Sequence, residues 1–209
     1  MITLHQGDLP DSLSFGDSVA VDTESLGLNW ERDRLCLVQL SSGDGNAHLV
    51  QFKKGEYDAP NLKRLLADPK VTKLFHFARA DLVTIKYYLG VMAAPVYCTK
   101  IASALTRTFT ERHGLKDLSR DLLGIDLSKE QQTSDWGAPN LTPEQLAYAA
   151  SDVLHLHQLR IKLDATLARE GRAALAAAIC QFLPTRAELD IAGWSDVDIF
   201  AHRPTSRPG

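Results

Sequence analysis

The chain has 209 residues, of which 44% are hydrophobic and 23% charged, so it has enough apolar material for a globular core. Its 23 basic and 26 acidic residues give a net charge of −3, which argues against a basic clamp for long duplex nucleic acid. This charge does not exclude a short nucleic-acid substrate held in a small local pocket. Its three cysteines lie far apart in the sequence, which favours reduced thiols and a cytoplasmic location. Without a long apolar run or a recognisable leader, neither export nor contact with a membrane is expected.

The first half of the chain alternates short apolar runs with turn residues. Strands are predicted over 18–24, 35–40 and 47–52, and the turn at 41–46 indicates that these three form a meander. Pro60 opens a predicted helix over 61–67, and a fourth buried strand follows over 71–77. A second helix is expected over 78–89, where Gly90 ends it.

The second half is predicted to be almost entirely helical. Helices are expected over 99–108 and 114–123, followed by a long helix from an N-cap at Thr142 to Arg169 and a last helix over 173–182. The sequence shows no internal repeat and no long linker, so residues 1–195 are predicted to form a single α/β domain. Residues 196–209 are polar and rich in proline, and are predicted to be a loose or partner-bound tail.

An acidic pair interrupts the first predicted strand. Asp22 and Glu24 lie two residues apart, so on a strand both side chains project from the same face. Such a pair is costly to bury unless a divalent cation compensates its charge. The alternative is a strand that ends at Val21, followed by a solvated turn.

Further candidates lie on predicted helices. Asp81 lies in the first turn of the predicted helix that follows a strand. Without the other acids, it would be interpreted as a residue that complements the helix dipole. Tyr148 and Asp152 share a face at i, i+4 spacing, and alone they would be read as a core tyrosine beside a surface acid. Together, the four carboxylates and the tyrosine can converge around two divalent metals, Mg²⁺ or Mn²⁺, of the kind that hydrolyse phosphodiesters. Tyr148 would then position the attacking water, because a phenol with a pKa of about 10 is a poor base.

Three sequence motifs support the same interpretation. The strings V-D-T-E-S-L-G-L, H-F-A-R-A-D-L and Y-A-A-S-D-V resemble the three exonuclease motifs of the DEDDy class, the ribonuclease D-like 3′–5′ exonucleases. The segment L-S-K-E-Q-Q-T-S-D-W is also typical of that family. The resemblance implies an RNase H-like α/β fold with a mixed central sheet, flanking helices and a helical C-terminal half. It also implies that the metal ligands are Asp22, Glu24, Asp81 and Asp152, and that Tyr148 positions the water.

Other strings resemble a compact branch of this family that lacks the helical RNA-binding domains of the longer members. They are G-D-L-P, R-D-R-L-C-L-V-Q-L-S, V-Y-C-T-K-I-A-S and F-L-P-T-R-A-E-L-D-I-A-G-W. The resemblance implies a ring-like homo-octamer that cleaves dinucleotides. Two departures from the wider family pattern are Cys98, where an Asp often precedes Thr99, and G-A-P-N at 137–140. The latter replaces an Arg-containing stretch and puts the phosphate contact of that Arg in doubt.

Four residues are predicted to contact the substrate: Thr23, Leu28, His76 and Trp136. An apolar edge at Leu28 would stack on any base without reading its identity, although a packed loop leucine is the alternative. For His76, a structural hydrogen bond is the alternative, and for Trp136 it is packing behind the site.

The combined hypothesis is a metal-dependent 3′–5′ exoribonuclease that hydrolyses very short RNA, chiefly dinucleotides, to nucleoside monophosphates. One rival is a general ribonuclease D-like exonuclease that trims longer RNA or DNA ends. A second is a non-catalytic nucleic-acid-binding scaffold, which the presence of all five motif residues disfavours. A paired-carboxylate glycosidase is a weaker rival, because it would not need the third and fourth acids or Tyr148.

Overall fold

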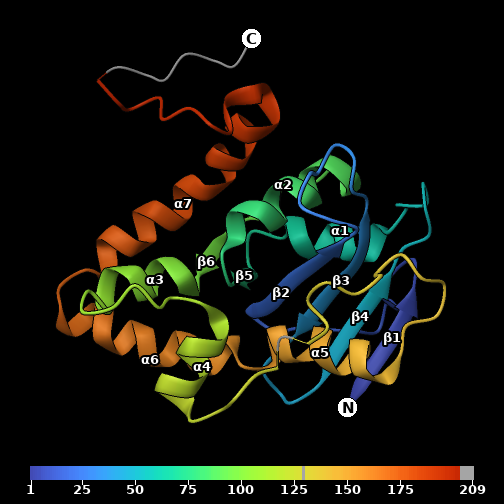
Figure 1. Cartoon of the computed structure of the whole chain (residues 1–209), viewed down its shortest axis with the longest axis horizontal. Coiled ribbons are helices and arrows are strands. Elements are labelled where there is room, and N and C mark those ends of the chain that lie inside the picture. The colour runs from blue at the N-terminus through green and yellow to red at the C-terminus, as the bar shows by residue number, and fades with distance from the viewer. Residues whose placement is uncertain (129, 203–209) are drawn as a thin grey trace.

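A computed structural model describes residues 1–128 and 130–202 of the chain, whose architecture is a mixed sheet with helices on both faces (Figure 1). The strands are β1 (Ile2–Gln6), β2 (Ser18–Ser25), β3 (Leu35–Ser41), β4 (Ala47–Gln51), β5 (Thr72–Phe75) and β6 (Val96–Cys98). The helices are α1 (Pro60–Ala67), α2 (Ala78–Leu89), α3 (Thr99–Thr106), α4 (Leu115–Leu123), α5 (Pro143–Leu154), α6 (Leu156–Arg169) and α7 (Ala173–Leu189).

The strand order is β1-β4-β3-β2-β5-β6, which places β2 inside the sheet. Strands β2, β3 and β4 pair antiparallel, so the predicted meander is confirmed. Strands β5 and β6 continue the sheet in parallel with β2, while β1 adds in parallel to β4 at the opposite edge. The sheet contains both antiparallel and parallel pairs and is therefore mixed, as predicted.

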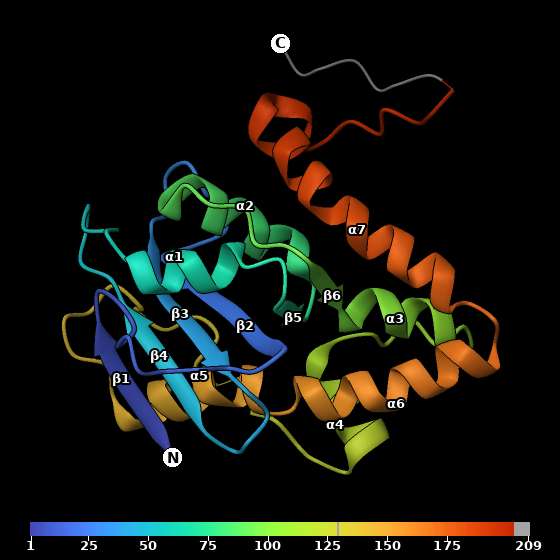
Figure 2. The same cartoon turned by 180° about the vertical axis from the view of Figure 1, so that it is seen from behind.

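Residues of β2 alternate between two apolar cores, because successive side chains of a strand point to opposite faces. Val19 and Val21 belong to the core that contains buried residues of α1, α2 and α7. Ala20 faces the core built with α5 and α6. Figure 2 shows the resulting layers, with α1 and α2 on one face of the sheet and α5 on the other. The acidic positions that follow Ala20 at two-residue steps are thereby directed toward α5.

Several predicted boundaries differ from the structure. The long helix predicted from Thr142 to Arg169 is two helices, since the backbone at His155 leaves the regular helical path. Helix α5 packs on β3 and β4, whereas α6 packs on α3. The break therefore allows the two helices to pack against different elements. The last helix extends well beyond the predicted end, through Pro184 to Leu189, and continues as a π-helical turn, Asp190–Trp194. Strands β1 and β6 were not predicted.

The segment after the π-helical turn packs on the protein as far as it is described. Val197 is buried, and the Phe200 ring lies edge-on to Phe182, with 6.0 Å between the ring centroids. The remainder of the predicted tail, 203–209, lies outside the described residues. Among the helices of the described ranges, none combines the length and apolar character needed to cross a membrane.

Candidate active site

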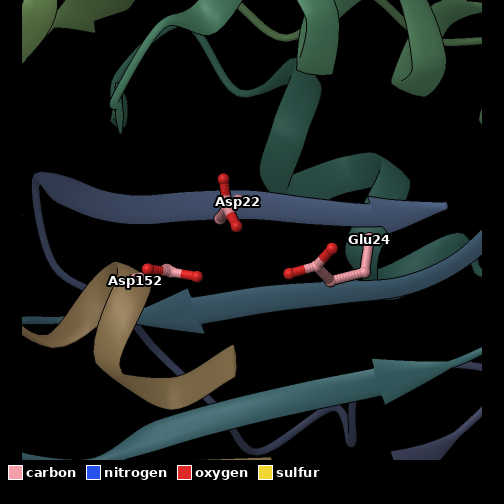
Figure 3. Close-up of side chains that lie close together, drawn as sticks. All are labelled: Asp22, Glu24 and Asp152. Atoms are coloured by element: carbon pink, nitrogen blue, oxygen red, sulfur yellow. The ribbon is translucent and has the colours of Figure 1, made fainter. Parts of the chain in front are cut away.

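Three of the predicted metal ligands converge between β2 and α5. Asp22 and Glu24 lie on β2, and Asp152 reaches them from α5 (Figure 3). One carboxylate oxygen from each of the three lies within 4.8 Å of the others. Helix α5 begins at a reciprocal capping box formed by Thr142 and Gln145.

Asp81 joins this group from the opposite side of β2. It is buried in the first turn of α2, and its Oδ1 accepts a hydrogen bond of 2.7 Å from Thr23 Oγ1. Thr23 lies between Asp22 and Glu24, so β2 presents two acids toward α5 and holds the fourth acid through its other face. Asp81 is close enough to Asp22 for the negative charge of Asp22 to raise the pKa of Asp81.

Burial raises the pKa of all four acids, and repulsion from neighbouring acids adds to the shifts of Glu24, Asp81 and Asp152. Burial alone accounts for an Asp22 pKa of about 7. Burial, followed by repulsion from Asp22, Asp152 and Asp81, raises the pKa of Glu24 to about 10. Burial and repulsion from Asp22 raise the pKa of Asp152 to about 8. Asp22 is thus the shared neighbour of the other three.

The site fits a hard divalent cation. Its candidate ligands are all carboxylate oxygens, the donor type that Mg²⁺ and Mn²⁺ prefer over the nitrogen and sulfur ligands of zinc. A cation among them would offset the repulsion that raises their pKa values. The acids therefore fit a divalent metal ion on chemical as well as geometric grounds.

Tyr148 lies one helical turn before Asp152 and lines the same cavity. Burial, with the nearby charges of Asp152 and Glu24, raises the pKa of its phenol above the ordinary value. The phenol therefore keeps its proton at neutral pH, which suits orienting a water molecule and excludes acting as a base.

Three of the acids, Asp22, Glu24 and Asp152, line a cavity of about 350 Å³. The lining of this cavity also includes His76, Phe77, Lys100 and Lys116. Phe77 has a positive φ of 65°, which a bulky residue rarely adopts, and Lys100 Nζ lies 3.8 Å from the centroid of its ring. Phe77 and the two lysines were not predicted from the sequence. The H-F-A-R-A-D string located the turn, but no sequence pattern signals the left-handed backbone that exposes the Phe77 ring.

The four residues predicted to contact the substrate differ in their position and exposure in the structure. His76 and Thr23 line the cavity. Leu28 is fully exposed, at 101% relative accessibility, so the alternative of a packed loop leucine is wrong, and base contact stays a prediction. The expected substrate contact of Trp136 is not supported: the indole is 2% exposed and lies behind Tyr148, with 6.0 Å between their ring centroids. Packing against Ala149 and Cys36 explains this burial.

A family model for the 3′–5′ exonuclease matches residues 8–168. The chain therefore belongs to the 3′–5′ exonuclease family, as a DEDDy, ribonuclease D-like enzyme with an RNase H-like fold. Within this class it is similar to NrnC of Brucella melitensis, with 54% identity, a TM-score of 0.94, and coverage of 97% of this chain and 98% of that one. Solved structures of that protein include one bound to pGG and one with bound Mg²⁺. The predicted family and enzyme class are thus confirmed.

More distant relatives are longer proteins. Ribonuclease D of Gluconacetobacter diazotrophicus is 38% identical over 154 residues, which are 74% of this chain and 39% of that protein. Ribonuclease D of Escherichia coli has a TM-score of 0.72 and 26% identity, with coverage of 87% of this chain and 48% of that one. The chain spans about two fifths of the length of the curated ribonuclease D relatives that it matches.

Proposed function

We propose that the protein is a 3′–5′ exoribonuclease that hydrolyses very short RNA, chiefly dinucleotides, to nucleoside monophosphates with two divalent metal ions. The observation that supports this proposal best is the convergence of Asp22, Glu24 and Asp152 in the lining of one cavity, with Asp81 buried close behind them.

The site residues would have different roles in hydrolysis. The four acids would hold the metal ions, Mg²⁺ or Mn²⁺. When bound, such ions supply charge that stabilises the attacking and leaving oxygens of a phosphodiester. Tyr148 keeps its phenolic proton, because its pKa is raised, and would orient the attacking water beside Asp152. Lys100 and Lys116 place positive charge in the lining of the same cavity, which would attract a polyanionic substrate.

Small substrate size is supported by the charge and the dimensions of the site. A protein that holds long RNA neutralises many phosphates, whereas this chain has a net charge of −3. The cavity of about 350 Å³ lies at the lower end of the roughly 300–1,000 Å³ usual for small-ligand sites. Affinity must then come from a few contacts near the scissile bond, including the exposed Leu28 beside a base. The similar Brucella protein has been solved with pGG, a dinucleotide.

We also propose a homo-oligomer, with an octamer favoured, that works in the cytoplasm. Large exposed apolar side chains on and after the C-terminal helices, including Ile161, Leu175 and Phe200, would be covered in such an assembly. The three buried, unpaired thiols are compatible with a reducing compartment. Light scattering would overturn the assembly if it measured a monomer of 23.0 kDa at every concentration tested.

The test is a time course on end-labelled RNAs of two to ten nucleotides with Mg²⁺ or Mn²⁺. We expect kcat/KM to fall by at least about tenfold from two to five nucleotides, which corresponds to about 1.4 kcal/mol of transition-state binding. An Asp81→Asn variant, purified in parallel, controls for contaminating nucleases. Equal or rising efficiency with length would instead favour a general ribonuclease D-like enzyme that trims longer ends.

A further inference from the structure

His76 is a neighbour of the metal-binding acids across the sheet. Strands β2 and β5 run parallel, with Ala20 opposite Leu74. Asp22 and His76 each lie two residues further along, and both line the cavity. The imidazole is therefore placed close to where a scissile phosphate and its adjoining ribose would lie.

A buried hydrogen-bond relay determines which ring nitrogen of His76 carries the proton. Thr99 is fully buried at the start of α3, and its Oγ1 donates to the carbonyl oxygen of Phe75 at 3.1 Å. Because a hydroxyl has a single proton, Thr99 Oγ1 can only accept in its other contact, which is His76 Nδ1 at 2.9 Å. Nδ1 must therefore be the protonated nitrogen, and Nε2 of the neutral ring is left as a hydrogen-bond acceptor.

The surroundings keep this ring neutral. Burial, with the nearby positive charge of Lys100, lowers the pKa of His76 to about 4. A neutral ring whose only free nitrogen is an acceptor cannot bind a phosphate oxygen, because both atoms would accept. It can bind a ligand group that donates. On a nucleotide these groups are the ribose hydroxyls and the N–H groups of the bases.

We propose that His76 Nε2 accepts a hydrogen bond from a ribose 2′-hydroxyl of the substrate and thereby selects RNA over DNA. The inference rests on the proposed exoribonuclease function and adds a specificity-determining residue to it. A ribose is favoured over a base because His76 and Asp22 lie at corresponding positions after the Ala20–Leu74 pair and line the same cavity, whereas Phe77 and Leu28 are exposed apolar side chains suited to bases. The 2′-hydroxyl is also the group that distinguishes RNA from DNA at a given site.

The test compares the wild type and His76→Ala on three dinucleotides: pGG, its 2′-deoxy form and its 2′-fluoro form. The fluoro analogue controls for sugar conformation, since it keeps an electronegative 2′ substituent but has no proton to donate. We expect the wild type to cleave pGG with at least tenfold higher kcat/KM than either analogue. His76→Ala should lose at least tenfold on pGG and less than threefold on the analogues.

A second variant and a second readout separate this role from a structural one. Thr99→Val keeps the shape of Thr99 but removes the relay, so it should reduce the preference for pGG over the deoxy form. Nitrogen NMR of the ¹⁵N-histidine-labelled wild type should show Nδ1 protonated and Nε2 unprotonated. The opposite tautomer would overturn the proposal.

Other outcomes are equally decisive. An equal loss on all three substrates would overturn the inference, as would a loss that depends on the base when pUU replaces pGG. If none of the dinucleotides is cleaved, the proposed function fails, and calorimetric binding of pGG and the deoxy form tests His76 separately. A ribose preference in binding that disappears in His76→Ala would still support the inference, and equal affinities in the wild type would refute it.

Discussion

Replacing Asp22 with asparagine should stabilise the metal-free protein, and the gain should grow with pH. Burial raises the pKa of Asp22 from 3.8 to about 7. Between these values the folded protein binds more protons than the unfolded chain, so stability falls as pH rises and the loss is complete above the folded pKa. The same charge repels Glu24, Asp81 and Asp152, and the substitution relieves that repulsion as well.

The size of the effect follows from the linkage. A shift of about three pKa units corresponds to a cost of about 4 kcal/mol when the group is ionised. At pH 5 the Asp22 carboxyl of the folded protein is largely protonated, so the cost there is smaller by about 3 kcal/mol. An asparagine side chain has its own desolvation cost, which does not change with pH and cancels in the comparison. For a chain of this length, about 3 kcal/mol corresponds to roughly 6–12 °C in Tm.

The assay is thermal unfolding in EDTA at pH 5 and pH 8, at one fixed protein concentration. The difference in Tm between Asp22→Asn and the wild type should be larger at pH 8 than at pH 5 by roughly 6–12 °C. Asp58→Asn is a matched control, since Asp58 is an exposed acid outside the cavity. Adding Mg²⁺ should raise the Tm of the wild type more than that of Asp22→Asn. A gap of equal size at both pH values would refute the reasoning.

Three further predictions concern water positioning, a buried ion pair and a loop. Tyr148→Phe should lower kcat by at least about tenfold, while Mg²⁺ still raises Tm as in the wild type, because only the phenolic proton is lost. Asp190→Ala should lower the free energy of unfolding by about 3 kcal/mol in denaturant titration, since it leaves Arg79 and Arg186 without their buried partner. An unchanged midpoint would contradict this estimate. Gly27→Ala should raise KM severalfold, because its methyl group would clash with the Asp33 carboxylate that shapes the Leu28 loop, and an unaltered KM would count against base contact there.

The cluster of acids could be predicted because the chemistry proposed for it constrains both residue type and spacing. A two-residue step on a strand puts Asp22 and Glu24 on one face, and a four-residue step on a helix aligns Tyr148 with Asp152. The close approach of Asp22, Glu24 and Asp152 in the structure agrees with both periodicities. The sequence could not indicate that Thr23, on the other face of the strand, would hold Asp81.

The missed features depend on tertiary contacts rather than local pattern. Strands β1 and β6 are short, and both form by pairing in parallel with strands distant in sequence. The break at His155 has no glycine or proline to mark it, and it accompanies a change of packing partner, since α5 packs on β3 and β4 and α6 packs on α3. The part of the cavity lining that the sequence did not predict, Phe77, Lys100 and Lys116, comes from separate segments of the chain.

The site depends on both layers of the protein because β2 uses both of its faces. One face brings Asp22 and Glu24 toward α5, and the other holds Asp81 of α2 through Thr23. Helix α2 is in turn tied to the C-terminal segment, since Arg79 donates two hydrogen bonds to Asp190 and a third to the Ser195 carbonyl. Arg79 and Asp81 lie in the same helical turn, so loss of this ion pair should loosen the helix that carries the fourth acid. A segment distant in sequence from the motifs thereby contributes to the geometry of the acids.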